Sequence, residues 1–364
     1  MYDPVKIGLV GLGFGACWYK RKRAAIEEYL TVVAGCDTNA VRRQSFEEEF
    51  HLECHNTLDE LLARRDIEAV ALFTPPGGRA DLIRKCAAAG KHVLTTKPFE
   101  RNADAAYQVL EEVRNAGLVV QLNSPAPAPA EDLRIMEEWR DRYRLGRPIA
   151  ADWETYVKYH EQYSNSWMDS FDACPVAPIF RLGIYGINEL ILLLGNVRAV
   201  QVAATRLLTG RPTPDNARLL LEFSSGAIGS VYASFCVDDS QCFPGALRIH
   251  YENGTICKRQ LSAGDPNNRA RFSAVELTLQ GRCNGQVVSE CRKIGVENRS
   301  GEYQLDRFVE AVRTGNSASG RDSSAVIANG IAVIEAMASA ESSHRRVEVK
   351  MFDKESNCLS HNNA

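Results

Sequence analysis

The sequence lacks an excess of charge of either sign, and this absence excludes two classes of partner. Its 364 residues include 43 Lys+Arg and 46 Asp+Glu, which give a formal net charge of −3. Proteins that hold nucleic acid or an anionic membrane through charge carry a basic excess or a basic patch. We therefore predict neither a nucleic-acid partner nor a membrane partner.

Cysteine pairs with metal-site spacing are absent as well. The eleven cysteines are scattered, none forms a C-x-x-C pair, and there are only seven histidines. Structural zinc sites usually take their ligands from such closely spaced pairs. We predict that the cysteines are mostly reduced and buried, and that the protein has no metal site.

Long apolar runs are missing too. No run of 18 apolar residues exists, and the first apolar segment starts within six residues of Met1. A membrane-spanning helix needs about 20 such residues, and a secretory signal occupies roughly 15 to 30 residues. These absences favour a cytoplasmic protein, whose length suffices for about two domains.

A glycine-rich turn near the N-terminus is the most informative feature that is present. The segment 7–10 predicts a buried strand and 17–29 predicts a helix, with G-x-G-x-x-A spacing between them. Glycines at these positions allow a tight turn and a close approach of a pyrophosphate, which the free N–H groups of the helix then bind. The predicted dinucleotide-binding turn comprises Gly11, Gly13, Phe14, Gly15 and Ala16.

An acid at the end of the next predicted strand indicates which dinucleotide binds. Asp37 follows the apolar segment 30–36 and lies 37 − 16 = 21 positions after Ala16. An acid about 20 residues beyond the turn binds the adenosine ribose hydroxyls. Since its carboxylate would repel a 2′-phosphate, we predict NAD rather than NADP. Arg42 could reach a phosphate, or it could belong to a solvated helix face.

Helix and strand patterns then alternate as far as residue 122, which predicts a parallel sheet covered by helices on both faces. Two predicted strands end in Thr74-Pro75-Pro76 and Thr96-Lys97-Pro98. In such folds ligands lie at the carboxyl ends of the strands. The residues Thr74, Pro75, Thr96, Lys97 and Asn123 are therefore predicted to contact the cofactor.

A proline-rich connector, 124–130, marks the predicted domain boundary. After it come several segments of alternating apolar and polar residues joined by short turns, a pattern typical of an open antiparallel sheet. We predict a Rossmann domain at 1–123, an α+β domain with a large, mixed, mostly antiparallel sheet at 124–352, and a frayed tail at 353–364. We expect the open sheet to mediate a homo-oligomer, a dimer or a tetramer.

This order of elements resembles the Gfo/Idh/MocA family of NAD(P)-dependent sugar and polyol oxidoreductases. The resemblance is strongest at 11–16, 87–98 and 182–195. The family's Glu-Lys-Pro strand end reads Thr96-Lys97-Pro98 here, and its Asp-x-Gly-x-His-x-x-Asp helix reads from Arg181 to Asn188, with Tyr185 in place of the histidine. Tyrosine at that position is similar to the glucose-fructose oxidoreductase and dihydrodiol dehydrogenase branches. Arg79 stands where many relatives carry histidine.

The resemblance implies that Lys97 and Tyr185 form a catalytic pair. A free tyrosine, with a pKa of about 10, is too weakly acidic to serve as a base at pH 7 unless nearby positive charge favours its phenolate. Lys97 and the nicotinamide ring of NAD⁺ would both supply such charge. The predicted substrate-binding residues are Lys97, Trp167, Arg181, Tyr185 and Asn188.

Each of these residues also has a structural reading. Tyr185 could be a core aromatic, Arg181 could make an interdomain salt bridge, and the aromatic stretch 156–169 could pack under a loop. For the whole chain we predict an NAD(H)-dependent oxidoreductase acting on a secondary hydroxyl or ketone of a sugar, glycoside or cyclitol, at C1 of a free sugar or at ring C3 of a glycoside. The alternatives are a non-catalytic sensor on the same fold, which the altered motifs favour, and an oxidoreductase that never releases its nucleotide.

Overall fold

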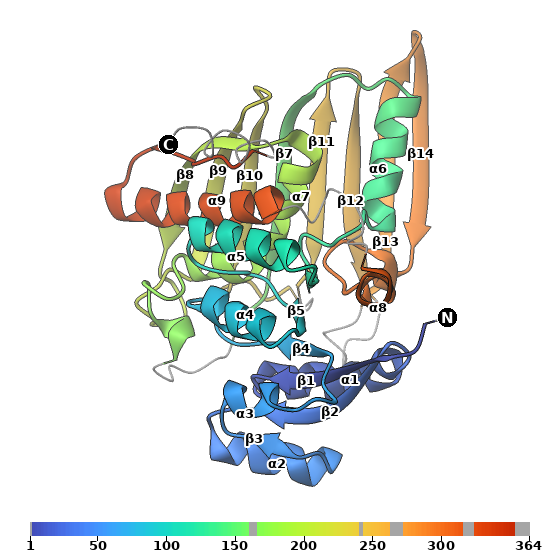
Figure 1. Ribbon diagram of the computed structural model, residues 1–364. Helices are drawn as coiled ribbons and strands as arrows, with labels where there is room; N and C mark the ends of the chain where they lie inside the picture. The colour runs from blue at the N-terminus through green and yellow to red at the C-terminus, as the bar shows by residue number, and fades with distance from the viewer. Residues whose placement is uncertain (1, 160–165, 240–242, 263–271, 316–323, 354–364) are drawn as a thin grey trace, which may run out of the picture. The chain divides into compact units, whose positions relative to one another are not determined.

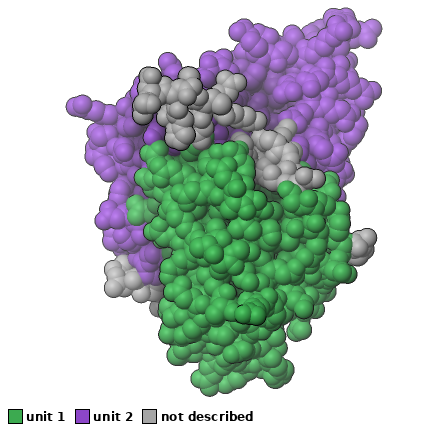
Figure 2. Space-filling view, in the orientation of Figure 1, with its two compact units in different colours: residues 1–128, 303–324 green, residues 129–302, 325–364 purple. Residues whose placement is uncertain are grey.

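The computed structural model describes residues 2–159, 166–239, 243–262, 272–315 and 324–353 (Figure 1). The chain forms two compact units, coloured separately in Figure 2. Unit 1 comprises Met1–Ala128 and Tyr303–Ser324, and unit 2 comprises Pro129–Glu302 and Ala325–Ala364. The chain first passes from unit 1 to unit 2 between Ala128 and Pro129, within the predicted connector 124–130 and after the predicted domain end at 123. The return of 303–324 to unit 1 has no signal in the sequence. The predicted frayed tail lies outside the described residues apart from Asp353.

Unit 1 contains the predicted parallel sheet, with strand order β3-β2-β1-β4-β5-β6. Its strands are β1 Val5–Val10, β2 Leu30–Cys36, β3 Cys54–His55, β4 Ala69–Leu72, β5 His92–Thr95 and β6 Val120–Leu122. Its helices are α1 Phe14–Glu27, α2 Ala40–Phe50, α3 Leu58–Leu62, α4 Arg79–Ala88, α5 Ala103–Asn115 and α8 Leu305–Thr314. The strand order reverses between β1 and β4, and in folds of this kind ligands bind at the carboxyl ends of the strands that flank such a reversal.

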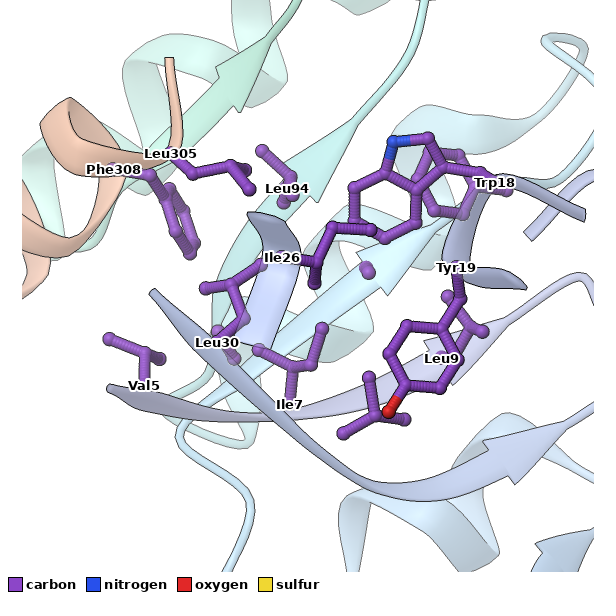
Figure 3. Packing of buried hydrophobic residues seen from close by; sticks show 14 of the residues in the cluster. Val5, Ile7, Leu9, Trp18, Tyr19, Ile26, Leu30, Leu94, Leu305 and Phe308 are labelled. Carbon is purple, nitrogen blue, oxygen red and sulfur yellow. The ribbon is translucent and has the colours of Figure 1, made fainter. Parts of the chain in front are cut away.

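Alternate residues of β1 form the centre of the unit 1 core. Val5, Ile7 and Leu9 are fully buried, and Trp18 and Ile26 of α1 pack on them (Figure 3). Leu305 and Phe308 of α8 belong to the same cluster, although almost 300 residues of chain separate them from β1 (Figure 3). This apolar packing is what returns 303–324 to unit 1.

Within the part of unit 2 that the structure describes, nine strands form a sheet of order β14-β13-β12-β11-β7-β10-β9-β8-β15, in which only β7 and β10 pair in parallel. Its strands are β7 Pro148–Tyr156, β8 Val197–Thr205, β9 Asn216–Phe223, β10 Ile228–Ser234, β11 Gly245–Tyr251, β12 Gly254–Ser262, β13 Phe272–Cys283, β14 Gln286–Ile294 and β15 Val347–Glu348. The helices α6 Glu131–Arg142, α7 Ile184–Leu194 and α9 Ser324–Ser343 lie over one face of this sheet (Figure 1). The predicted fold class, α/β with a large mixed sheet, is confirmed.

The strand β12 does not follow from apolar alternation. Its residues Ile256, Lys258 and Gln260 share the helix-covered side of the sheet, because successive side chains of a strand point to opposite faces. Ile256 is fully buried and Lys258 is 8% exposed. A lysine at an inward position interrupts the period-two pattern by which strands are recognised.

The helix α9 is long and apolar enough to cross a membrane, by length and composition alone. However, 72% of its most apolar window is buried inside the protein. Ile331, Val333 and Met337 are among its core side chains. A buried core helix accounts for this composition.

Candidate active site

The glycine turn after β1 can be formed only by glycine at its first position. Gly11 has φ +86°, and a Cβ there would lie 2.5 Å from the carbonyl oxygen of Phe73. Its N–H donates to the carbonyl oxygen of Cys36 over 2.9 Å. The turn is therefore held against the carboxyl ends of both neighbouring strands, β2 and β4.

The start of α1 leaves an open cradle for an anion. Gly13 is the residue before the helix and makes no side-chain cap, and Phe14 is 57% exposed. A Cβ at Gly13 would lie 3.3 Å from the guanidinium carbon of Arg42. Uncapped N–H groups at a helix start bind phosphate. Gly15 and Ala16 follow within the helix, and Ala16 packs against the core.

Asp37 and Arg42 lie beside this cradle. One carboxylate oxygen of Asp37 accepts from the Leu12 N–H over 2.9 Å, and the other accepts from the Asn39 N–H over 2.8 Å. Nη1 of Arg42 lies 3.5 Å from Oδ2 of Asp37, and the Arg42 side chain is 56% exposed. Arg42 is thus more than part of a solvated helix face, because it pairs with the acid predicted to bind ribose.

A second group of predicted cofactor residues follows β4 and β5. Asn123 is 4% exposed, and its Oδ1 lies 3.4 Å from both the Lys97 N and the Thr96 Oγ1. The Lys97–Pro98 peptide bond is cis. The Thr74 Oγ1 is buried and has no hydrogen-bond partner among the residues the structure describes. An orphaned hydroxyl near a glycine cradle fits a bound dinucleotide.

Arg79, at the start of α4, joins the two strand ends. It is 1% exposed, and its guanidinium donates to the carbonyl oxygens of Thr96 over 2.7 Å and of Phe99 over 3.0 Å. It also donates to the carbonyl oxygens of Pro98 and Thr74. Burial lowers the pKa of Arg79 to about 10, and the negative charge of Glu100 opposes that shift. In the sequence, Arg79 was notable only because many relatives carry histidine at this position. That difference did not predict its hydrogen bonds to the two strand ends.

In unit 2, Tyr185 is the second residue of α7 and is half-buried. A π-helical turn, Ile179–Gly183, precedes it. Single π-helical turns are frequent at functional sites. The backbone of Gly301, with φ +92°, lies against the Tyr185 ring, where an added Cβ would come within 3.1 Å of two ring carbons. The ring therefore has a defined neighbour on one edge.

Arg181 lies in the π-helical turn and stacks on aromatic rings. Its guanidinium carbon is 4.7 Å from the ring centroid of Tyr159 and 5.0 Å from that of Phe235. Such cation–π contacts hold an arginine in place while leaving its planar edge for hydrogen bonds. The predicted binding of substrate by Arg181 stays a prediction.

The other predicted substrate residues have different surroundings. Trp167 lies on a short 3-10 turn, with its ring 6.4 Å from that of Phe180. Asn188 is 4% exposed, and its Oδ1 lies 2.4 Å from the place a Cβ of Gly330 would occupy, so its carboxamide faces α9. Its contact with substrate stays a prediction. His160 and Tyr163, in the aromatic stretch, lie outside the described residues.

Asp169, in that same stretch, has a structural role. It is 2% exposed, and its Oδ1 lies 2.7 Å from the Nε of Arg211, which is buried to the same degree. A charge buried in such a pair holds two segments together and is costly to expose. Asp169 therefore anchors the loop that carries Trp167.

Sequence patterns gave no indication of a second buried ionic cluster in unit 2. The Nζ of Lys258 donates to Asp132 over 3.0 Å, to Glu189 over 2.8 Å and to Ser300 over 3.1 Å. Ser300 also contacts both carboxylates. Glu189 lies one turn after Tyr185 on α7, and Ser300 precedes Gly301. The cluster thus fixes the two segments that meet at Tyr185.

The protonation of this cluster follows from its charges. Burial alone would raise the pKa of Asp132, but Lys258 and the hydrogen bonds from Ser300 hold it below its ordinary value. Burial alone would lower the pKa of Lys258, but Asp132 and Glu189 hold it above its ordinary value. Asp132 and Lys258 are therefore held in their charged forms inside the protein.

The fold and these residues define a dinucleotide-binding oxidoreductase with a second, sheet-based domain. Residues 5–124 match the model of an oxidoreductase family with an NAD-binding Rossmann fold, and residues 133–257 match the GFO/IDH/MocA C-terminal domain. Together the two models cover more than half of the chain. The protein belongs to the GFO/IDH/MocA family, as its motifs predict.

Individual relatives are distant. D-xylose 1-dehydrogenase (NADP(+)) 2 of Haloferax volcanii is 25% identical over 276 residues, which are 72% of this chain and 75% of that protein. Galactose 1-dehydrogenase of Pseudomonas fluorescens is 27% identical over 208 residues, 56% of this chain and 64% of that protein. Levoglucosan dehydrogenase, in complex with NADH and L-sorbose, shares the fold with a TM-score of 0.76 at 16% identity, covering 96% of this chain and 100% of that chain.

Proposed function

We propose that the protein is an NAD(H)-dependent oxidoreductase that transfers a hydride between nicotinamide and a secondary hydroxyl or ketone of a sugar, glycoside or cyclitol. The observation that carries this proposal is the meeting of the glycine cradle, the orphaned Thr74 hydroxyl and the Lys97 strand end at one edge of the unit 1 sheet. Relatives named as xylose and galactose dehydrogenases support a sugar substrate.

The chemistry divides between two side chains. When bound, the nicotinamide supplies the carbon that accepts or releases the hydride. Lys97 donates a hydrogen bond to the reacting oxygen and stabilises the negative charge that develops there. Tyr185 removes the hydroxyl proton during oxidation and returns it during reduction. Trp167 offers a ring face to the sugar, and Arg181 and Asn188 bind its oxygens.

Absorbance at about 340 nm tests this function. Purified protein is mixed in turn with free sugars, aryl glycosides, cyclitols and their keto forms, in the presence of NAD⁺ or NADH. We expect one class of compound in this panel to change the absorbance, which identifies the class of substrate. Protein that binds NADH but leaves the absorbance constant with every compound would support the alternative, a non-catalytic sensor. That alternative draws on Thr96 and Arg181, which stand where the family's usual motifs carry acids.

Cofactor choice is proposed to rest on Asp37. We expect the wild-type protein to prefer NAD⁺, because the Asp37 carboxylate repels a 2′-phosphate. In Asp37→Ser that repulsion is absent and Arg42, which lies 3.5 Å from the carboxylate, can bind the phosphate. Steady-state kinetics should show the ratio of kcat/KM for NADP⁺ to that for NAD⁺ rising by about 100-fold, equivalent to roughly 3 kcal/mol.

A double variant is the control for this change. In Asp37→Ser with Arg42→Ala the repulsion is still absent, but the phosphate has lost its arginine, so most of the gain should disappear. A wild-type protein that uses NADP⁺ as well as NAD⁺ would contradict the assignment. The name of the Haloferax relative specifies NADP⁺, so the preference for NAD⁺ is proposed for this chain and is not carried over from that relative.

The predicted homo-oligomer and cytoplasmic location stay predictions. Leu220 of β9 and Ile228 of β10 lie on the sheet face opposite the buried apolar residues Leu219 and Val231, and they are 48% and 62% exposed. We propose that a second copy of the chain covers these side chains. Static light scattering of the purified protein measures the number of subunits directly.

A further inference from the structure

Two buried charged residues join the start of α4 to the segment 96–100, which carries Lys97. Arg79 lies on the helix and donates hydrogen bonds to the segment, and Glu100 lies on the segment and accepts hydrogen bonds from the helix. Arg79, on the helix, donates to the carbonyl oxygens of Thr96, Pro98 and Phe99 on the segment. These carbonyls flank Lys97 on both sides. Nη1 contacts all three carbonyls, and the planar guanidinium holds Nη2 at a fixed distance from it for a further acceptor, which a single ammonium nitrogen cannot do.

Glu100 makes the reciprocal contacts. It is 3% exposed, and its Oε2 accepts from the Ala80 N–H over 2.8 Å while its Oε1 accepts from the Gly78 N–H over 3.3 Å. The first N–H groups of a helix have no partner within the helix, so a carboxylate there serves as a cap. Glu100 therefore holds the start of the helix that carries Arg79.

These contacts leave the segment around Lys97 little freedom. Arg79 holds it from the carbonyl side, Asn123 lies 3.4 Å from the Lys97 N, and Glu100 fixes its far end to α4. The fourth contact of Arg79, to the Thr74 carbonyl oxygen, ties the same segment to the end of β4. All of these residues belong to unit 1.

We propose that Arg79 and Glu100 form a clamp that positions Lys97 for catalysis. Arg79 is a positioning residue, since its contacts are with the backbone on either side of Lys97. The inference rests on the proposed function for the role of Lys97 in turnover, but the clamp itself can be measured without turnover. A lysine-specific reagent reacts with the neutral amino form, so its rate with Lys97 depends on the surroundings of that amino group, whatever the substrate.

Lys91 provides a matched control. It precedes β5, and its Nζ donates to the carbonyl oxygens of Ile67 over 2.6 Å and Arg64 over 3.1 Å. Like Arg79, Lys91 is a cation that binds backbone carbonyls near β4 and β5. Its contacts lie at the amino ends of these strands, whereas those of Arg79 lie at the carboxyl ends. Removing Lys91 should affect stability without moving Lys97.

The experiment compares Arg79→Met, Arg79→Lys and Lys91→Met with the wild-type protein. The first readout is the rate at which trinitrobenzenesulfonate labels Lys97, followed by mass spectrometry of the Lys97 peptide. We expect Arg79→Met to change that rate at least about threefold, Arg79→Lys to change it less, and Lys91→Met to leave it unchanged. Arg79→Lys also keeps the test usable if Arg79→Met does not fold.

The second readout is the division between kcat and KM. Small displacements of a positioned group cost about 100-fold in rate. We expect kcat to fall about 30- to 100-fold in Arg79→Met, with the substrate KM within about threefold of wild type, and kcat of Lys91→Met to stay near wild type. The clamp is refuted if folded Arg79→Met labels and turns over like wild type, or if Lys91→Met shows the same losses. If Arg79→Met changes the labelling of Lys97 but the wild-type protein turns over no substrate, the clamp is supported and the proposed function is refuted.

Discussion

Replacing Lys97 by Met is expected to lower kcat for hydride transfer by about 1,000-fold in a protein that still binds NADH. The variant keeps the length of the side chain but removes the only group proposed to stabilise the developing alkoxide, and such groups contribute about 100- to 1,000-fold each. Tyr185→Phe should lower kcat by about 100- to 10,000-fold, the usual range for a lost acid/base group. Stopped-flow absorbance at saturating substrate measures both values.

The double variant tests whether the two residues act as a unit. If Lys97 polarises the oxygen whose proton Tyr185 removes, Lys97→Met with Tyr185→Phe should be little slower than the worse single variant, because residues of one catalytic unit are strongly non-additive. NADH fluorescence in each variant confirms that the cofactor site is intact. A Lys97→Met protein that retains more than about a tenth of the wild-type kcat would remove Lys97 from the mechanism.

The other large effect is on stability. Lys258→Met is expected to destabilise unit 2 by about 3 to 5 kcal/mol at pH 7, because it leaves Asp132 and Glu189 buried without their shared cation. The side chains of Lys258 and Glu189 are each 9% exposed and that of Asp132 is fully buried, so solvent screens the pair little. Urea unfolding followed by tryptophan fluorescence measures the loss, since three of the four tryptophans, Trp139, Trp153 and Trp167, lie in unit 2.

The pH dependence of this loss has a definite sign. In the wild-type protein the pKa of Asp132 is lowered, so its ionised form stabilises the fold above the unfolded pKa, and that contribution is lost as the pH falls through the lower folded value. Without Lys258, burial raises the pKa of Asp132 instead, and the carboxyl can be buried in its neutral form. The deficit of Lys258→Met should therefore be smaller at pH 5 than at pH 7.

A triple variant separates charge from packing. Lys258→Met combined with Asp132→Asn and Glu189→Gln leaves no buried charge, and it should recover part of the stability that Lys258→Met alone has lost at pH 7. If Lys258→Met is within about 1 kcal/mol of wild type at pH 7, the cluster does not hold unit 2 together in the way proposed.

Local features of the fold were predictable because nearby residues encode them. The strand, glycine turn and helix around Gly11 follow from sterics within a few residues, and the parallel sheet follows from the alternation of helix and strand patterns. Thr57 and Glu60 have the three-residue spacing typical of a capping box, and α3 begins with that box, in which the Thr57 hydroxyl accepts from the Glu60 N–H. Each of these features depends on residues only a few positions apart in the sequence.

Features that depend on distant residues were not predictable. Lys258 is 126 residues from Asp132 and 69 from Glu189, so nothing near it in the sequence shows that a lysine can face the core of β12. The contacts of Arg79 with residues 17 to 20 positions away have the same character. The return of α8 to unit 1 likewise depends on apolar packing against β1, which no local pattern encodes.

Transfer of deuterium from the cofactor to the substrate is the most direct test of hydride transfer. NADH carrying deuterium at C4, in either stereochemical form, is mixed in a single turnover with the keto sugar that the absorbance panel identifies, and the product is examined by mass spectrometry. We expect one deuterium at the reduced carbon from one of the two forms, and none from the other. Deuterium that stays on bound NADH with both forms, in protein that still binds the sugar, would contradict catalysis and leave a cofactor-binding sensor.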